Sequence, residues 1–479
     1  MRNRSAGKGE GVSTRCAVMA MSVVAILVAL WPAPVAAQLQ VDITAGVTDP
    51  IPIAVQPFEG DAAALAQIVA ADLGRSGRFV IRPRNEADYL VTGRAAPSSA
   101  AASGGALALV IGFELQNLLT GQTLLKETLS APVAVTRPAA HRISDRIYFR
   151  LIGQRSAFAT RIAYVIVEGL PPQRRYRLMV ADADGALPRV VLESRRPLMS
   201  PAWSPDGRWL AYVSFETRSA AVYVQDLRTA ERRAVSMRPG VNGAPAWSPD
   251  GTRLALTLSS PTGNLDIHLL DPRDGTLERL TDDPAIDTEP VWSADGRTIF
   301  FTSDRAGGPQ VYRITARAGE RAQRITFGTP YAARPRLSPD GRLLALVVRD
   351  EGGYRIAVQP LAGGERRVLS RGPQDESPAF SPDGGTLIYA ARVGGSGTLE
   401  AVTIDGLVRY RLQSPAVDAR EPSWGPLPPS VPYFCLSDPS FLGDPSWEMP
   451  SACRWPCFCL APLQPVPRTV RRHPMPQRR

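Results

Sequence analysis

Short apolar runs separated by turn residues dominate the chain from about residue 161 to 424. After Gly207, the runs Trp209–Ser214 and Ala221–Leu227 follow one another, and Ile299–Thr302 has the same character further on. These runs are rich in β-branched and aromatic residues, and none of them has the period of a helix. The pattern therefore predicts an all-β domain built from short strands.

A motif of the type Trp-Ser-Pro-Asp-Gly recurs through this region every 43 to 45 residues. Its copies begin at Trp203, Trp247, Trp292, Leu337, Phe380 and, in shortened form, Trp424. Such a period with strand-like content is typical of β-propeller blades. Pro, Asp and Gly each suit one corner of a tight turn, so we expect turns here and not Ca²⁺ sites, which need six to eight converging oxygens. The leading aromatic or apolar residue is expected to pack between neighbouring blades.

The two ends of the repeat region predict how the ring closes. Arg161–Val167, Tyr176–Asp182 and Arg189–Leu192 resemble the last three strands of a blade whose first strand is missing. Glu421–Trp424 is a first strand with nothing behind it. Joining them gives a six-bladed β-propeller over residues 160–425, closed by a composite blade that leaves no open edge.

The stretch 38–159 has a different pattern. A strand is expected at Pro52–Phe58, helices at Ala62–Arg75 and Pro138–Ile152, and a hairpin within 107–131. Apolar residues recur on one face of each helical segment. The mixture of strands and helices predicts a small α/β domain that precedes the propeller.

The beginning of the chain resembles a secretory signal at residues 1–37. Basic residues up to Arg15 precede an apolar run, Ala17–Trp31, and the small residues Val35 to Ala37 offer a cleavage site. The run is short for a membrane span, which needs roughly 20 residues. We expect a cleaved signal, periplasmic location and no integral membrane segment afterwards; an uncleaved anchor is the alternative.

The segment 426–479 fits no part of the preceding pattern. It is rich in proline and carries four of the five cysteines, Cys435, Cys453, Cys457 and Cys459. These thiols lack the paired spacing of a zinc site, so we expect no bound metal. The segment is predicted to be disordered and to have arisen by read-through or a frameshift.

The chain offers little catalytic chemistry. It has only three histidines, His141, His268 and His473, and neither a Gly-x-Ser-x-Gly elbow nor a phosphate-binding glycine loop. The net charge of +10 is spread over the signal, the tail and a mixed remainder, with no basic stripe that would indicate nucleic-acid binding. We therefore predict a protein without catalytic activity or cofactor.

Loops that precede the innermost strands should gather at one mouth of the propeller channel. They are Val241–Ala244, Asp287–Glu289, Ala333–Arg334 and Asp375–Ser377. Small and polar residues there suit a bound peptide or loop, although such loops can equally be solvated turns.

Several stretches resemble the TolB family, the periplasmic propeller proteins of the Tol-Pal system. They are Arg161–Val165, Asn242–Gly251, Thr288–Trp292 and Phe301–Tyr312. The order of signal, α/β domain and six repeats strengthens the resemblance. It departs from the family in one respect, since family members end soon after the last Trp motif while this chain continues from Pro426.

The resemblance implies a protein-binding scaffold. It would bind the peptidoglycan-associated lipoprotein Pal at the propeller mouth and TolA through the segment Gln38–Asp49, in support of outer-membrane constriction at cell division and of envelope integrity. Other outer-membrane proteins, and bacteriocins during their import, would be further partners. The predicted partner-binding residues are Val241, Asn242, Gly243, Ala244, Thr288, Glu289, Arg334 and Glu376 at the mouth, and Val41, Asp42 and Ile43 in the segment.

Two other classes of function remain open from sequence. One is a relative of propeller-containing peptidases or lyases. The other is a propeller that binds cell-wall carbohydrate, which aromatic platforms at the mouth would favour; the rim loops offer only Tyr331.

The short apolar run that ends at Val35-Ala36-Ala37 predicts a mature N-terminus at Gln38. Intact-mass analysis or Edman degradation of the protein recovered from the periplasm measures this directly. A chain that still begins at Met1 would show that the segment remains as an anchor.

Overall fold

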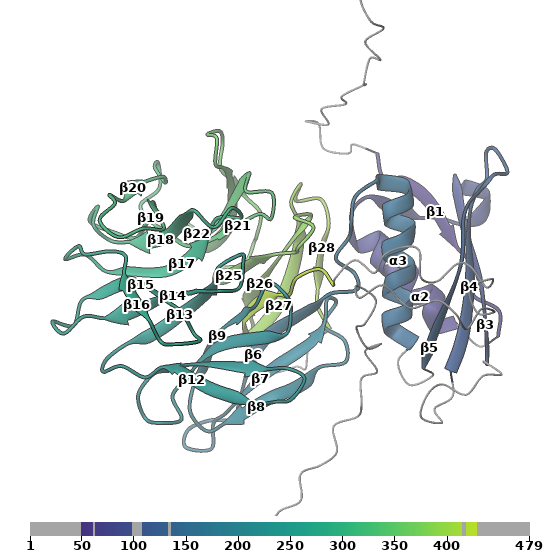
Figure 1. Cartoon of the computed structure of the whole chain (residues 1–479). Helices are drawn as coiled ribbons and strands as arrows, with labels where there is room; N and C mark the ends of the chain where they lie inside the picture. The colour runs from purple at the N-terminus through teal and green to yellow at the C-terminus, as the bar shows by residue number, and fades with distance from the viewer. Residues whose placement is uncertain (1–48, 61–62, 98–107, 133–135, 414–417, 429–479) are drawn as a thin grey trace, which may run out of the picture. The chain divides into compact units, whose positions relative to one another are not determined.

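The structure is a computed structural model that describes residues 49–60, 63–97, 108–132, 136–413 and 418–428. Within these residues the chain forms one five-stranded sheet with helices, followed by six four-stranded sheets (Figure 1). This is the predicted α/β domain followed by a six-bladed propeller. Among the described residues, no helix combines the length and apolarity needed to cross a membrane.

The five-stranded sheet has the order β2-β1-β3-β4-β5. Its strands are β1 (Ile51–Val55), β2 (Phe79–Ile81), β3 (Tyr89–Pro97), β4 (Ala108–Asn117) and β5 (Thr123–Pro132). Its helices are α2 (Ala63–Arg75), α3 (Thr136–Ile152) and the short 3-10 helix η1 (Arg84–Glu86). β1 runs parallel to β2 and β3, whereas β3, β4 and β5 are antiparallel.

One apolar core holds this domain together. Ile53 from β1, Leu73 from α2, Ile111 from β4 and Ile143 and Ile147 from α3 are fully buried in it. Leu73, Ile143 and Ile147 belong to the apolar faces of the two predicted helices, so the helices bury those faces against the sheet. The predicted cap of the first helix, Asp61, lies outside the described residues.

Each blade of the propeller is an antiparallel sheet. From the innermost strand outward, three blades are β9 (Leu198–Trp203), β10 (Trp209–Ser214), β11 (Ala221–Asp226) and β12 (Arg232–Ser236); β13 (Asn242–Trp247), β14 (Leu254–Ser259), β15 (Leu265–Leu270) and β16 (Leu277–Arg279); and β17 (Asp287–Trp292), β18 (Thr298–Ser303), β19 (Gln310–Thr315) and β20 (Gln323–Arg324). The other three are β21 (Ala332–Leu337), β22 (Leu343–Asp350), β23 (Gly353–Pro360) and β24 (Arg367–Val368); β25 (Asp375–Phe380), β26 (Thr386–Val393), β27 (Ser396–Thr403) and β28 (Arg409–Arg411); and β29 (Asp418–Trp424), β6 (Arg161–Glu168), β7 (Arg175–Asp182) and β8 (Arg189–Ser194).

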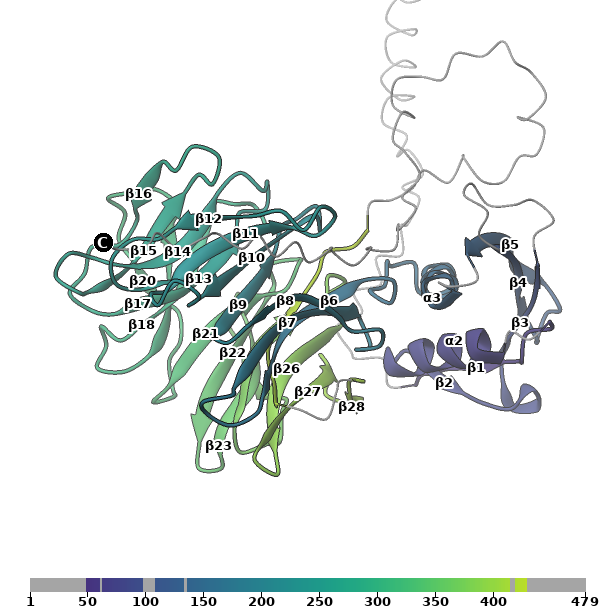
Figure 2. The same cartoon turned by 90° about the horizontal axis from the view of Figure 1, so that it is seen from below.

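The last blade closes the ring from both ends of the repeat region. β29 pairs antiparallel with β6, with Asp418 opposite Val167 and Trp424 opposite Ile162. The innermost strands then contact one another in turn, from β9 through β13, β17, β21 and β25 to β29 and back to β9 (Figures 1 and 2). The predicted composite blade is therefore confirmed.

The repeated Ser-Pro-Asp-Gly segments are turns, as expected. In five of them the Ser hydroxyl donates to the Asp carboxylate at 2.5–2.6 Å and accepts the backbone N–H five residues after the Ser. The turn glycine has positive φ, for example 67° at Gly207 and 70° at Gly251. Because each Asp carboxylate is hydrogen-bonded within its own turn, these carboxylates do not converge on a common site.

Leading tryptophans of the motif link neighbouring blades by hydrogen bonds. Nε1 of Trp203 donates to the carbonyl of Ser423 at 3.2 Å, and Nε1 of Trp292 donates to the carbonyl of Ala246 at 3.1 Å. In each case donor and acceptor belong to adjacent blades. The indole N–H of Trp247 is buried with no hydrogen-bond partner among the described residues. The expected packing between blades is thus confirmed, although Trp247 lacks the hydrogen bond that Trp203 and Trp292 form.

This difference predicts unequal effects of two matched substitutions. Trp292→Phe leaves the carbonyl of Ala246 without its donor, whereas Trp247→Phe removes a donor that has no acceptor. A lost hydrogen bond costs about 1 kcal/mol and a buried unsatisfied group costs more. We expect Trp292→Phe to lower the free energy of unfolding by at least about 1 kcal/mol more than Trp247→Phe, measured by urea denaturation. Equal losses of unfolding free energy in the two variants would show that the hydrogen bond from Trp292 to Ala246 does not stabilise the propeller.

Candidate functional site

A ring of six equivalent residues surrounds the propeller channel, one from each innermost strand. Each lies three positions before the motif's leading residue, is followed by proline, and has a left-handed backbone. They are Ser200 (φ 51°), Ala244 (45°), Glu289 (56°), Arg334 (55°), Ser377 (55°) and Glu421 (49°). Residues other than glycine rarely adopt positive φ. Its recurrence in all six blades therefore marks a built feature, which we call the mouth ring.

A β-bulge accounts for this backbone. On β13, Gly243 pairs with Thr257 and Ala246 with Ala255, so two residues of the inner strand lie opposite one residue of β14. The other five blades show a register shift at the same place. A bulge leaves its extra residue outside the ladder, and the following proline has no N–H to contribute.

Two glutamates of the ring satisfy backbone groups that the bulges free. The carboxylate of Glu289 accepts the N–H of Arg334 at 3.0 Å, and that of Glu421 accepts the N–H of Ser200 at 2.5 Å. Each bond connects a blade to the next one around the ring. These glutamates therefore link neighbouring blades at the mouth and also give it negative charge.

The charges of the ring are concentrated on one side. The guanidinium of Arg334 pairs with the carboxylate of Glu289 at 3.0 Å and with that of Glu376 at 3.8 Å. Burial lowers the pKa of Arg334, but these carboxylates and that of Glu421 outweigh it and raise the pKa overall. Burial raises the pKa of Glu421. Polar contacts thus bring together Glu289, Arg334 and Glu376, three of the predicted residues.

The remaining predicted residues have different surroundings. Val241 is 42% exposed, whereas Asn242 is fully buried. The side-chain amide of Asn242 donates to the carbonyl of Arg238 and accepts the Ser236 hydroxyl, so it fixes the loop that presents Val241. The hydroxyl of Thr288 accepts a hydrogen bond from that of Thr257 at 3.3 Å, so β17 is linked here to β14 of the preceding blade. Val41, Asp42 and Ile43 lie outside the described residues.

Exposed apolar side chains accompany the mouth ring. Met199, one residue before Ser200, is 38% exposed, and Ile286, just before β17, is 47% exposed. Together with Val241, which just precedes β13, they mark the beginnings of three innermost strands. Apolar groups beside satisfied polar ones are what a protein interface offers. Val241 was among the predicted partner-binding residues, whereas Met199 and Ile286 were not recognised from the sequence.

No ring residue lines the cavity of about 500 Å³ that the structure describes. That cavity is bordered instead by charged and aromatic side chains, among them Arg75, Asp184, Tyr148 and Tyr410. This cavity is therefore separate from the mouth.

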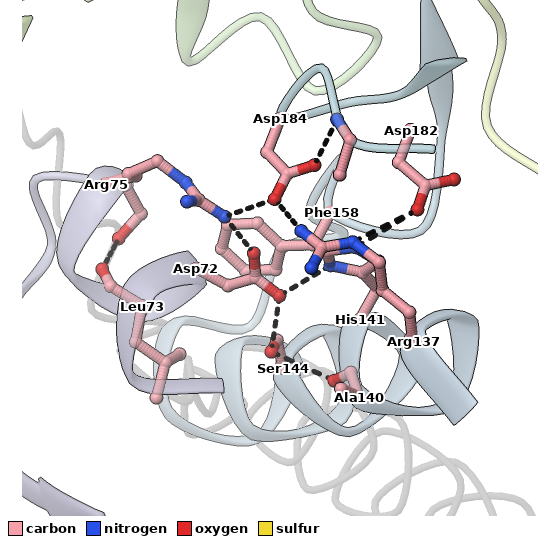
Figure 3. A network of polar contacts seen from close by, with 12 residues as sticks. Asp72, Leu73, Arg75, Arg137, Ala140, His141, Ser144, Phe158, Asp182 and Asp184 are labelled. Carbon is pink, nitrogen blue, oxygen red and sulfur yellow. Dashed lines mark hydrogen bonds and ion pairs between the residues drawn. The ribbon is translucent and has the colours of Figure 1, made fainter. Parts of the chain in front are cut away.

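A second polar cluster lies beside this cavity (Figure 3). It joins three carboxylates to three basic side chains. These are Asp72 and Arg75 on α2, Arg137 and His141 on α3, Asp182 at the end of β7 and Asp184 just after it. Asp72 accepts from His141 Nδ1 and from the Ser144 hydroxyl, both at 2.8 Å. Asp184 accepts from Arg137 and, at 3.4 Å, from Arg75.

The ligand atoms of His141, Asp182 and Asp184 lie close enough together to hold a metal ion. The cationic side chains argue against that use. Arg137 contacts both carboxylates, and Arg75 reaches Asp184 as well. With the three carboxylates already matched by three cations, the arrangement favours a buried ion-pair network.

His141 is the titrating member of this network. Burial alone would lower its pKa, but the nearby carboxylate of Asp182, the hydrogen bond to Asp72 and the negative charge of Asp184 raise it to about 9. The imidazole is therefore protonated at neutral pH and holds the negative charge of Asp72 in the interior. The sequence analysis placed His141 on the second helix but gave no sign of its partners.

The comparisons with known proteins agree over most of the chain. The family model "TolB beta propeller domain" matches residues 148–428, and the model "TolB amino-terminal domain" matches residues 39–113. The Tol-Pal system protein TolB of Methylococcus capsulatus is 49% identical over 426 residues, covering 84% of this chain and 98% of that protein. The one from Alcanivorax borkumensis is 45% identical over 427 residues, covering 84% and 96%. The crystal structure of TolB from Acinetobacter baumannii is 38% identical with a TM-score of 0.73, covering 79% of this chain and 97% of that one.

The raised pKa of His141 predicts a pH-dependent stability. Its folded value, about 9, exceeds the ordinary 6.5, so its contribution is complete below pH 6.5 and disappears as the pH rises through about 9. We expect His141→Gln to reduce the free energy of unfolding on the order of 1–3 kcal/mol at pH 6, with a smaller difference from wild type at pH 10.

Urea denaturation at several pH values measures this, with His268→Gln as the control. Burial lowers the pKa of His268, so that variant should show no such trend above pH 7. Asp145, whose pKa burial raises to about 7, titrates in all three proteins and cancels from the comparison. A His141→Gln difference that is independent of pH would show that the imidazole is not held charged.

Proposed function

This chain belongs to the TolB family of Tol-Pal system proteins, and we propose that it is a periplasmic scaffold without catalytic activity. Its mouth ring binds the peptidoglycan-associated lipoprotein Pal. Its N-terminal segment, Gln38–Asp49 with Val41, Asp42 and Ile43, binds TolA. Through these contacts it supports outer-membrane constriction during cell division and the integrity of the envelope.

The mouth ring is the observation that carries this proposal. Each of the six blades has a residue with positive φ at the same place in its innermost strand, although a regular strand would avoid this backbone strain. Backbone strain of this kind costs on the order of 1–3 kcal/mol per residue and persists at sites that need a fixed geometry. The cost supports a role in recognition, because the bulges hold the ring residues in place before a partner arrives.

The composition of the mouth favours a protein over a small molecule. Small side chains at Gly243 and Ala244 leave room for an inserted loop, and Thr288 offers a hydroxyl beside them. The exposed side chains of Met199, Val241 and Ile286 add apolar contact area around it. Such a small-residue centre with an apolar and polar surround is the arrangement in which a few central residues dominate affinity.

Ala244→Arg tests this site. Ala244 already has φ of 45°, so the longer side chain adds little backbone strain, but it places a charge where the inserted loop should pack. Burying an unpaired charge costs several kcal/mol, and about 3 kcal/mol corresponds to more than a hundredfold in affinity. We expect calorimetric titration with Pal to show at least that loss, with the thermal unfolding of the variant unchanged.

Ala230→Arg is the matched control. Ala230 is also an alanine with positive φ, 61°, but it is exposed in the outer turn between β11 and β12, whereas Ala244 is half-buried. It should bind Pal as wild type does. Wild-type affinity in Ala244→Arg would mean that the partner uses another face, and unfolding of that variant would mean that the loop belongs to the core.

A further inference from the structure

One position next to the mouth ring carries a charge in a single blade. The residue immediately before the motif's leading residue is small or aliphatic in four blades and a serine in a fifth. In blade order the six residues are Ala202, Ala246, Val291, Arg336, Ala379 and Ser423. Arg336, on β21, is thus the only charged residue among the six at this position.

Arg336 lies on the innermost strand of its blade, two residues after Arg334 of the mouth ring and just after the bulge. The charges that influence it are those of Glu289, Arg334 and Glu421. These three are mouth-ring residues on β17, β21 and β29, which belong to three different blades. Arg336 therefore lies next to the charged part of the mouth ring.

Arg336 is not matched by an anion of its own. Its one hydrogen bond joins Nη1 to the carbonyl of the preceding Pro335 at 2.8 Å. The nearby carboxylates are engaged elsewhere, since Glu289 pairs with Arg334 and Glu421 accepts from Ser200. Among the described residues no carboxylate forms an ion pair with it, and burial lowers its pKa.

A half-buried guanidinium with free donors is an energetic cost in the free protein. The same group gains most from an incoming anion, because its planar fork can bind both oxygens of a carboxylate in a site partly withdrawn from water. Phosphate oxygens would bind in the same way. Because Arg336 lies next to the mouth ring, where the proposed partner inserts a loop, a carboxylate on that loop is the favoured ligand.

We propose that Arg336 is a specificity-determining residue of the mouth, which receives the carboxylate of an aspartate or glutamate on the loop that a partner protein inserts. The inference rests on the proposed function, since it assumes that a loop enters the mouth. It adds that this loop is acidic at its tip and that partners without such a residue bind more weakly.

Arg336→Gln, which keeps a similar length and hydrogen-bonding capacity without the charge, tests the proposal. We expect its affinity for Pal to fall at least tenfold in calorimetric titration, and its affinity to depend less steeply on salt than that of wild type. Arg336→Lys keeps the charge and should lie between the two. The control is Arg342→Gln, which removes an exposed charge from the turn of the same blade and should change affinity less than twofold.

A second measurement tests the cation without Pal. Succinate presents carboxylates to the free protein, and its effect on Tm can be followed by differential scanning fluorimetry. Wild type and Arg342→Gln should be stabilised by succinate more than Arg336→Gln. Equal stabilisation of all three overturns the site, whether or not Pal binds.

The two measurements separate the possible failures. If wild type does not bind Pal but succinate acts through Arg336, the proposed function fails while the anion site stands. If succinate acts through Arg336 but Arg336→Gln binds Pal as wild type does, the site accepts free anions only and the partner carboxylate is excluded. Should Arg336→Gln fail to fold, Arg336→Lys decides: affinity weakened more than tenfold despite the retained charge would overturn the proposal.

Discussion

Pairing between β29 and β6 is the interaction on which the rest of the propeller depends. Without it the sheet β6-β7-β8 would lack its innermost strand, and β25 and β9 would each lose a neighbour in the ring. The mouth ring needs this pairing because Glu421 lies on β29 and its carboxylate holds the N–H of Ser200 on the next blade. In the closed ring every innermost strand contacts an innermost strand on both sides. Closure therefore fixes the geometry of the site as well as the fold.

The mouth combines two requirements that usually conflict. A bulge followed by proline in every innermost strand weakens the ladder locally, yet the same bulges place six side chains in equivalent positions around one channel. The freed N–H groups of Arg334 and Ser200 are recovered by glutamates from the preceding blades. Structure and recognition therefore share residues here. A change at Glu289 affects both the link between two blades and the charge that a partner meets.

Much of this architecture follows from the spacing of one motif. The period of 43 to 45 residues predicted the number of blades, and the mismatch between its two ends predicted the composite blade. The ring residues were partly recognised. Ala244, Glu289 and Arg334 were predicted as binding residues and Ser377 was included in a rim loop, while Ser200 and Glu421 were missed. Reading the residue three positions before every leader would have found all six.

Other features had no local signal in the sequence. A bulge changes which side chains face the mouth, so the buried, loop-holding role of Asn242 cannot be inferred from strand alternation. The network of Asp72, His141 and Asp182 joins segments far apart in the chain, and each member alone resembles an ordinary polar residue on a helix or strand. Only tertiary packing reveals that His141 holds a charge.

The six prolines that follow the ring residues also limit how any partner can bind. A polypeptide that adds itself to a sheet as an extra strand needs N–H donors along the exposed edge. Pro201, Pro245, Pro290, Pro335, Pro378 and Pro422 remove that donor from the same place on every innermost edge. A partner that inserts as proposed would therefore be recognised here by side chains and not by main-chain pairing with these edges. Ala244 forms no side-chain hydrogen bond to a neighbouring blade, unlike Glu289 and Glu421, so a substitution there would change what such a partner contacts while the backbone of the ring stays constant.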